Sequence, residues 1–189
     1  VFYVFIVASE ETMIEVKDIS KHYGRKVVLD GVDLQFPIGK ITSLIGSNGA
    51  GKSTLLSIVS RLLAQDGGVV MVDGKNVTDY KNKVLAQRFS ILKQSNHVRL
   101  KLTVRELVSF GRFPYSQDKL TDEDNEKVDR AIHFLDLEDI KDAYIDELSG
   151  GQKQRAYMAM VVAQDTDYVL LDEPLNNLDM KHSVQTMKT

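Results

Sequence analysis

Hydrophobic positions in the first part of the chain alternate with polar ones in the way that β-strands require. The alternation is clear at residues 14–19, and residues at about 27–35 and about 40–45 also have the composition of strands. Because successive side chains of a strand point to opposite faces, these segments are predicted to be strands. Two shorter strands are expected at residues 69–72 and 89–92, where apolar runs are bounded by polar or glycine residues.

The hydrophobic spacing changes to that of a helix after the third strand. A helix is predicted from Ser53 to about Leu63. Its buried side would consist of the apolar residues at helical spacing, namely Leu55, Leu56, Val59, Leu62 and Leu63. The pattern is helical again from about Thr103 to Ala163, and within it residues 122–135 begin with acidic side chains, which suit a helix N-terminus. This second helix would bury Val128, Ile132 and Leu135.

Residues 168–171 form an apolar run without alternation, which is typical of a strand buried on both faces of a parallel sheet. Taken together, the elements predict an α/β fold. It would have an N-terminal antiparallel β portion, a parallel core sheet and a helical subdomain at about residues 95–163.

The first twelve residues precede Met13, which is followed at once by an alternating segment. We expect Met13 to be the native start and residues 1–12 to be upstream or non-native sequence. The alternative is that they form an extra strand at a sheet edge. Residues 1–8 are apolar, but they are fewer than the about 20 that span a bilayer, and they lack the basic start of a secretory signal.

The composition is that of an ordinary globular domain, with 43% hydrophobic and 27% charged residues among 189. A net charge of −3 argues against a nucleic-acid partner held by bulk electrostatics. The absence of cysteine excludes disulfides and thiolate metal sites. One domain with a substantial core is expected at this length.

A glycine-rich segment, Gly-Ser-Asn-Gly-Ala-Gly-Lys-Ser at residues 46–53, fits the phosphate-binding pattern G-x-x-x-x-G-K-[ST]. Its glycines lack Cβ, so the backbone can curl and turn its N–H groups toward phosphate. Lys52 would reach the β- and γ-phosphates, and the Ser53 hydroxyl would bind Mg²⁺. The alternative is a glycine-rich turn with a lysine by chance, but the segment lies between a predicted strand and a predicted helix.

Two acidic residues, Asp172 and Glu173, follow the apolar run at 168–171. Open α/β sheets bind ligands at the exits of their strands, where a carboxylate such as Asp172 can hold Mg²⁺. Glu173 is then the candidate that orients or deprotonates an attacking water, provided that it stays off the metal. A helix-capping role is the alternative for one acid, although it explains the pair less well.

A second glycine-containing motif, Leu-Ser-Gly-Gly-Gln at residues 148–152, opens a predicted helix. The N–H groups of Ser149, Gly150 and Gly151, with the Ser149 hydroxyl, could face a phosphate. Ser149 and Gln152 also fit a capping box, and both interpretations can hold for the same helix end.

Residues 46–53 and 148–152 together resemble the phosphate loop and signature sequence of the ATP-binding cassette (ABC) ATPases. The resemblance covers residues 13–189, as an ABC nucleotide-binding domain that is incomplete at its C-terminal end. In this family the signature caps the nucleotide held by a second copy. The resemblance therefore implies a head-to-tail dimer, with ATP and Mg²⁺ as cofactors.

The resemblance assigns roles to further residues. Residues 168–174 are similar to the Walker B strand with its catalytic glutamate, and residues 175–179 to the D-loop, with Asn176 where serine is more usual. Gln94 resembles the Q-loop glutamine, a catalytic and metal-coupling residue, although a glutamine at a strand end is ordinarily a solvated loop residue. Tyr23 resembles the aromatic that stacks on adenine, with a packing tyrosine as the alternative.

The implied site falls into three sets. The catalytic residues are Glu173 and Gln94, and the metal ligands are Ser53, Gln94 and Asp172. The residues that bind the nucleotide are Tyr23, Gly46, Ser47, Asn48, Gly49, Ala50, Gly51, Lys52, Ser53, Thr54, Ser149, Gly150, Gly151, Gln152 and Asp179.

The family's switch histidine lies on a strand after the D-loop helix. His182 is too close to Asp179 to fill that role, and only 16 residues follow Glu173. A helix, a strand and two loops do not fit into that length. We therefore expect a chain cut within a helix.

The spacing between motifs narrows the choice within the family. The 54 residues between Gln94 and Ser149 leave no room for the coiled-coil insertion of the DNA-repair relatives. Residues 102–115 resemble the importers of iron complexes, so iron–siderophore uptake is expected. Partners would be transmembrane permease subunits and, indirectly, a substrate-binding protein, at the cytoplasmic face of a bacterial membrane. Alternatives are uptake of haem, cobalamin or another substrate, a soluble ABC ATPase acting on the ribosome or DNA, and a nucleotide-binding regulator.

Overall fold

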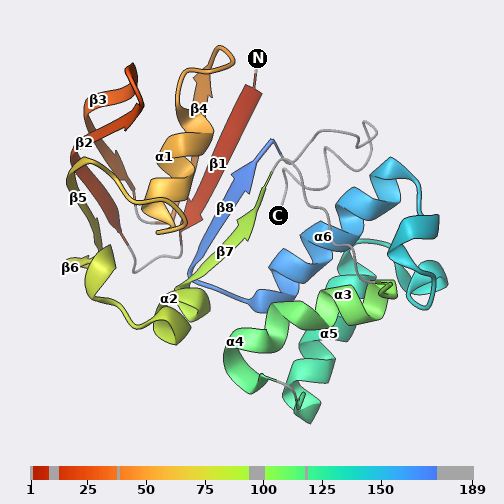
Figure 1. Cartoon of the computed structure of the whole chain (residues 1–189). Coiled ribbons are helices and arrows are strands. Elements are labelled where there is room, and N and C mark those ends of the chain that lie inside the picture. The colour runs from red at the N-terminus through yellow and green to blue at the C-terminus, as the bar shows by residue number, and fades with distance from the viewer. Residues whose placement is uncertain (1, 9–12, 38, 94–100, 118, 174–189) are drawn as a thin grey trace. The chain divides into compact units, whose positions relative to one another are not determined.

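The computed structural model describes residues 2–8, 13–37, 39–93, 101–117 and 119–173. These residues form two compact units, which are described separately (Figure 1). The first unit runs to Ile91 and also includes Asp167–Glu173. The second contains the described residues of Leu92–Thr166. No helix in the described part of the chain is both long and apolar enough to cross a membrane.

The first unit contains an antiparallel sheet of four strands in the order β3-β2-β5-β6. The strands are β2 (Ile14–Tyr23), β3 (Lys26–Phe36), β5 (Gly67–Val72) and β6 (Lys75–Asn76). The predicted strands at 14–19, 27–35 and 69–72 fall within them. The ladder between β2 and β3 shifts register three times, the last time between Lys21 and His22.

A second sheet has the order β4-β1-β8-β7. Its strands are β1 (Phe2–Ala8), β4 (Ile41–Gly46), β7 (Phe89–Leu92) and β8 (Tyr168–Asp172). The β1 strand is antiparallel to both β4 and β8, so these two strands run parallel to each other. Residues 2–8 thus form the extra strand of our alternative reading, but inside the sheet instead of at its edge.

The register of β1 sets where its neighbours end. Phe2 pairs with Gly46, the last residue of β4, and Val4 pairs with Asp172, the last residue of β8. The carboxyl ends of β4 and β8 therefore lie close together at one end of the sheet. This arrangement brings the phosphate loop near the acidic pair, although the antiparallel strand β1 lies between β4 and β8 in the sheet.

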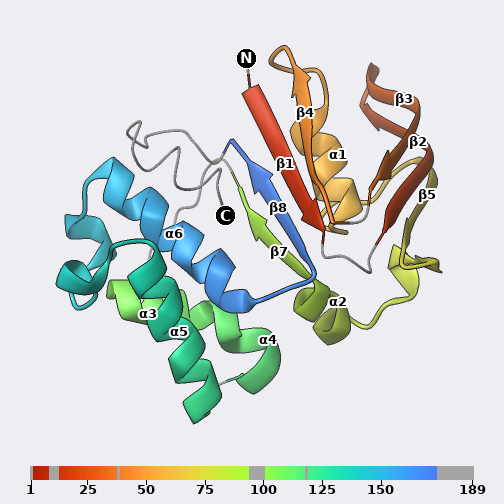
Figure 2. The same ribbon diagram turned by 180° about the vertical axis from the view of Figure 1, so that it is seen from behind.

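Helix α1 (Lys52–Val59) lies between the two sheets (Figures 1 and 2). Its apolar residues join one core with side chains from both sheets, including Ile14, Phe36, Val70, Tyr168 and Leu170. A short 3₁₀ turn, η1 (Val77–Asp79), and α2 (Asn82–Arg88) connect β6 to β7.

The prediction that α1 extends to Leu63 is wrong. Arg61 has a φ of 57°, which ends the helix, and the side chain of Leu62 is 52% exposed instead of buried. The Arg61 guanidinium donates hydrogen bonds to the carbonyls of Val77 and Tyr80. These long-range bonds hold the turn, and no local spacing could reveal them.

The second unit is helical. Helices α3 (Val104–Ser109), α5 (Asp122–Phe134) and α6 (Gly150–Gln164) pack against one another (Figure 2). Its shorter elements are η2 (Phe110–Arg112), α4 (Phe113–Ser116), η3 (Glu138–Ile140) and η4 (Ile145–Glu147). The helix predicted at 122–135 is confirmed, and Val128, Ile132 and Leu135 are buried. A Cβ on Gly111 would lie 2.3 Å from the Met160 carbonyl oxygen, so glycine allows η2 to approach α6 closely.

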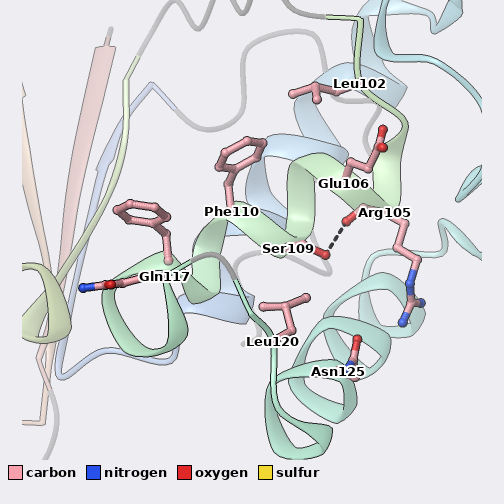
Figure 3. A pocket seen from close by; sticks show the side chains of 9 residues that line it. Leu102, Arg105, Glu106, Ser109, Phe110, Gln117, Leu120 and Asn125 are labelled. Carbon is pink, nitrogen blue, oxygen red and sulfur yellow. Dashed lines mark hydrogen bonds between the residues drawn. The ribbon is translucent and has the colours of Figure 1, made fainter.

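A groove of about 520 Å³ opens on the helical unit between α3, α4 and α5 (Figure 3). The phenyl rings of Phe110 and Phe113 are 48% and 53% exposed along it. The other lining residues are Leu102, Arg105, Glu106, Ser109, Gln117, Leu120 and Asn125. This combination of apolar rings and a few polar groups is typical of a binding surface.

Candidate nucleotide-binding site

The glycine-rich loop connects the end of β4 at Gly46 to the start of α1 at Lys52. Gly51 precedes the helix with a φ of 88°, which favours glycine. A Cβ on Gly51 would lie 2.8 Å from Cδ2 of Leu29 and 2.9 Å from the Val28 carbonyl oxygen, so the loop rests closely on β3. No side chain in the described part of the chain caps the N-terminus of α1. Its first N–H groups are therefore suited to an anion.

Lys52 carries its positive charge back over this loop. Its Nζ donates hydrogen bonds to the carbonyl oxygens of Gly46 at 3.0 Å and Ser47 at 2.9 Å. A lysine ammonium has three N–H donors, so these two bonds still allow a third acceptor. The cation thus lies at the same loop as the N-terminus of α1, and both favour bound phosphate.

Ser53 and Asp172 meet at the end of the second sheet. The Ser53 hydroxyl donates a hydrogen bond of 3.0 Å to Oδ1 of Asp172, and the Asp172 side chain is buried. Hydroxyl and carboxylate oxygens are ligands that Mg²⁺ accepts, and Mg²⁺ in nucleotide sites is held by few protein groups. The described residues contain no cluster of three or more histidine, aspartate or glutamate side chains that could hold a metal by themselves. The pair therefore fits a metal that shares its ligands with phosphate.

Glu173 follows Asp172 directly and adopts a φ of 52°. This left-handed conformation is strained for a residue with a Cβ, and such strain often accompanies functional sites. Here it turns the chain sharply after β8, so that Glu173 does not continue the strand beside Asp172. Its side chain is partly exposed at the same sheet end as the phosphate loop.

Tyr23 ends β2, and its side chain is 50% exposed. A tight turn at Gly24 joins it to β3, where Tyr23 pairs with Lys26. The following residues of β3, Val28 and Leu29, are the ones that contact Gly51. One hairpin therefore presents an exposed aromatic ring and supports the phosphate loop. This contact could not be predicted from the sequence, because no local pattern marks Val28 as a neighbour of Gly51.

The second glycine motif lies in the helical unit. Ser149 is the N-cap of α6, and its Oγ accepts a hydrogen bond from the Gln152 N–H at 3.3 Å. Oε1 of Gln152 accepts in return from the Ser149 N–H at 2.9 Å. The capping box is thus formed. A phosphate-binding role for Ser149, Gly150 and Gly151 is compatible with this geometry and stays a prediction.

Several predicted site residues lie outside the described part of the chain. They are Gln94, Asp179 and the rest of the segment at 175–179. His182, which the sequence excludes as the switch histidine, also lies outside it. A second capping box, at Thr103 and Glu106, was overlooked, although its T-x-x-E pattern stands at the start of α3.

A strand, a glycine-rich loop, a helix without a side-chain cap and a buried acid at the end of another strand of the same sheet together define a P-loop nucleotide-binding protein. A sequence model described as "ABC transporter" matches residues 29–176. The chain therefore belongs to the ABC transporter family, and ATP hydrolysis is the activity of that family's P-loop module.

Individual relatives are named as ATP-binding proteins of importers, in agreement with this family. The chain is 58% identical over 176 residues to the petrobactin import ATP-binding protein YclP of Bacillus subtilis (strain 168). It is 52% identical over 176 residues to the petrobactin import ATP-binding protein FatE of Bacillus anthracis. Each match covers 93% of this chain and 70% of the relative. A solved structure of a bacterial Atm1-family ABC exporter with ATP bound is similar in fold, with a TM-score of 0.80 at 21% identity. That match covers 96% of this chain and 33% of the exporter chain.

Proposed function

We propose that this protein binds and hydrolyses ATP to power an importer of iron–siderophore complexes. The observation that carries the ATPase part is the Ser53–Asp172 hydrogen bond beside the phosphate loop. The cargo is supported by the relatives above, both of which are named for petrobactin import. Haem, cobalamin or another substrate is the alternative cargo.

Different residues would bind the phosphates, hold the metal and activate the attacking water. The N–H groups of residues 47–52 and the Lys52 ammonium would bind the β- and γ-phosphates, and Tyr23 would stack on adenine. Ser53 and Asp172, with Gln94, would hold Mg²⁺, which neutralises phosphate charge during transfer. Glu173 would orient the attacking water and accept its proton.

A second subunit would complete the site. The exposed end of α6, at Ser149–Gly151, would face the γ-phosphate bound by the other copy in a head-to-tail dimer. Asp179 would lie at the same interface. This arrangement would explain why a capped helix end also carries two glycines, since their N–H groups can approach phosphate closely.

The groove lined by Phe110 and Phe113 supports contact with a membrane permease. Two exposed phenyl rings beside the Arg105 and Glu106 side chains suit an amphipathic segment that inserts an apolar residue. In our proposal the protein acts at the cytoplasmic face of the membrane, bound to permease subunits that also receive a substrate-binding protein. Replacing Phe110 and Phe113 by serine should then abolish uptake while ATP binding persists.

Growth on a siderophore tests the cargo. A strain that lacks the gene should lose growth on iron supplied as ferric petrobactin, and the wild-type protein should restore it while Lys52→Ala should not. Growth on ferric citrate is the control. Unchanged growth of the deletion strain on every iron complex, haem and cobalamin would exclude an importer role and favour the ribosomal, DNA or regulatory alternatives.

A further inference from the structure

One carboxylate, that of Asp66, binds the two residues that precede Tyr23. Oδ1 accepts a hydrogen bond from Nζ of Lys21 at 2.7 Å, and Oδ2 accepts one from the His22 N–H at 2.7 Å. Nδ1 of His22 lies 3.3 Å from the same Oδ2. The Asp66 N–H also donates to the Ser20 carbonyl at 2.9 Å, so Asp66 both accepts hydrogen bonds from β2 and donates one to it.

These hydrogen bonds lie next to the last of the three register shifts between β2 and β3, and beyond Ser20, the last residue of β2 that pairs with β5. The pairing with β3 shifts register between Lys21 and His22, because Lys21 pairs with Leu29 and His22 with Val27. At that shift the His22 N–H donates to Asp66. A strand that leaves its ladder needs another partner for its backbone donors. Asp66 is that partner, and it therefore sets the direction in which the chain enters Tyr23.

Asp66 also fixes the cation nearest the tyrosine ring. Nζ of Lys21 lies 6.0 Å from the ring centroid of Tyr23 while it donates to Asp66. The Lys21 side chain is 13% exposed, so its stem is held against the protein. The hydrogen bond from Lys21, followed by that from the His22 N–H, lowers the pKa of Asp66 to about 2. The Asp66 carboxylate is thus charged at neutral pH and can accept the hydrogen bonds from both Lys21 Nζ and the His22 N–H.

We propose that Asp66 is a positioning residue for the base of the bound nucleotide, acting through Lys21 and His22 to hold the exposed ring of Tyr23. The inference rests on the proposed stacking of adenine on Tyr23. Asp66 itself touches no part of the nucleotide. It lies between the end of α1 and the start of β5, and so it links the loop that follows the phosphate-binding helix to the strand that ends in the aromatic ring.

The test distinguishes binding of the base from binding of the phosphates. Affinities of Mg-ATP and of Mg-tripolyphosphate, which has no base, are measured for the parent chain and for Asp66→Ala. Misplacing the ring should remove part of the contribution that stacking of the base makes to binding, so ATP affinity should fall by about 3- to 10-fold. Tripolyphosphate affinity and the rate at saturating ATP should stay within about 2-fold.

The matched control is Asp33→Ala. Asp33 also accepts a hydrogen bond from the backbone of β2, from the Asp18 N–H at 2.9 Å, but five residues before Tyr23. We expect this variant to bind ATP as the parent does. Asp66→Asn is the second variant, since its amide oxygen can still accept from His22 while the ion pair with Lys21 is lost. It should give an intermediate affinity and decides the matter if Asp66→Ala does not fold.

A double variant tests whether Asp66 acts through the ring. In a Tyr23→Ala background, Asp66→Ala should add no further loss of ATP affinity. Additive losses, or equal losses for ATP and tripolyphosphate, would overturn the inference and leave Asp66 as a purely structural tie. Parent-like ATP affinity of Tyr23→Ala would instead remove the stacking role on which the inference rests. Weak ATP binding by Tyr23→Ala together with parent-like ATP binding by the single variant Asp66→Ala would refute the positioning role alone.

Discussion

The hydroxyl of Ser53 lies 3.0 Å from a carboxylate oxygen of Asp172, although the two residues are 119 positions apart in the chain. They meet because β4 and β8 run parallel and end at the same side of the sheet, where each strand leads into a polar segment. The fold thereby joins the loop that suits phosphate to the acid that suits a metal.

If Ser53 and Asp172 bind Mg²⁺, substituting either residue should weaken ATP affinity only when Mg²⁺ is present. Ser53→Ala and Asp172→Ala should each weaken Mg-ATP while affinity for ATP in EDTA changes little. Because the two side chains are in contact, a double-mutant cycle should give a coupling of about 0.5–3 kcal/mol. Titration calorimetry with and without Mg²⁺ measures both quantities.

Ser57→Ala is the control for that cycle. Ser57 lies one turn later on α1, and its Oγ donates to the Ser53 carbonyl at 2.8 Å, away from Asp172. Its removal should leave Mg-ATP affinity unchanged. Equal weakening of ATP by Ser53→Ala in Mg²⁺ and in EDTA would show that the hydroxyl does not contact the metal.

Lys52→Ala should remove the main cation at the phosphate loop. A hydrogen bond to a charged group contributes about 1.5–3 kcal/mol, so ATP affinity should fall by at least about 10- to 100-fold. Since, within the described residues, Nζ donates only to the carbonyls of its own loop, thermal unfolding should shift little. Lys40→Ala, at an exposed position before β4, is the matched control. ATP binding by Lys52→Ala at the parent affinity would contradict the phosphate-loop assignment.

Glu173→Gln should block hydrolysis and preserve binding, because the amide keeps the shape of the side chain and loses the base. General base catalysis contributes about 10²- to 10⁴-fold, so the single-turnover rate should fall by that order. Unlike glycine, glutamine also keeps the strained backbone at this position, so only the chemistry changes. Hydrolysis at the parent rate would exclude Glu173 as the catalytic carboxylate.

Much of the fold could be predicted because its signals are local. The strand at residues 89–92 and the helix that begins at Asp122 were expected at the observed positions, since each has a clear period and a clear boundary. The phosphate loop was recognisable for the same reason. Its pattern of four fixed positions lies within eight consecutive residues, 46–53.

The remaining features depend on contacts between distant segments. Arg61 ends α1 early through bonds to the carbonyls of Val77 and Tyr80, and no spacing in residues 53–63 indicates this. The place of β1 within the second sheet depends on its pairing with β4 and β8, which lie far from it in the sequence. Asp66 belongs to no sequence motif, and its hydrogen bonds from Lys21 and the His22 N–H depend on the fold.

The helical unit contains a buried ion pair whose loss should be costly. Nε of Arg112 donates to Asp124 at 2.8 Å, and both side chains are almost fully buried. The Arg112 guanidinium also donates to the carbonyls of Ala163 and Gln164 at 3.0 Å, at the end of α6. Removing one member of a buried pair leaves the other charge unpaired, which costs about 3–5 kcal/mol. Asp124→Ala should therefore lower the free energy of unfolding by this amount.

Low pH should lower the free energy of unfolding for the same reason as Asp124→Ala, because protonation removes the charge of Asp124. Burial alone would raise the pKa of Asp124, but hydrogen bonds from Ser116, Thr121 and Arg112 outweigh it and hold that pKa well below its usual range. A lowered pKa in the folded state means that the stabilisation is complete above the ordinary aspartate pKa and is lost as pH falls below it. Urea unfolding between pH 7 and pH 3 should show this loss in the parent. Asp124→Asn should be less stable at pH 7 and should show a smaller loss. An identical pH dependence in both proteins would mean that Asp124 does not stabilise the fold as a charged group.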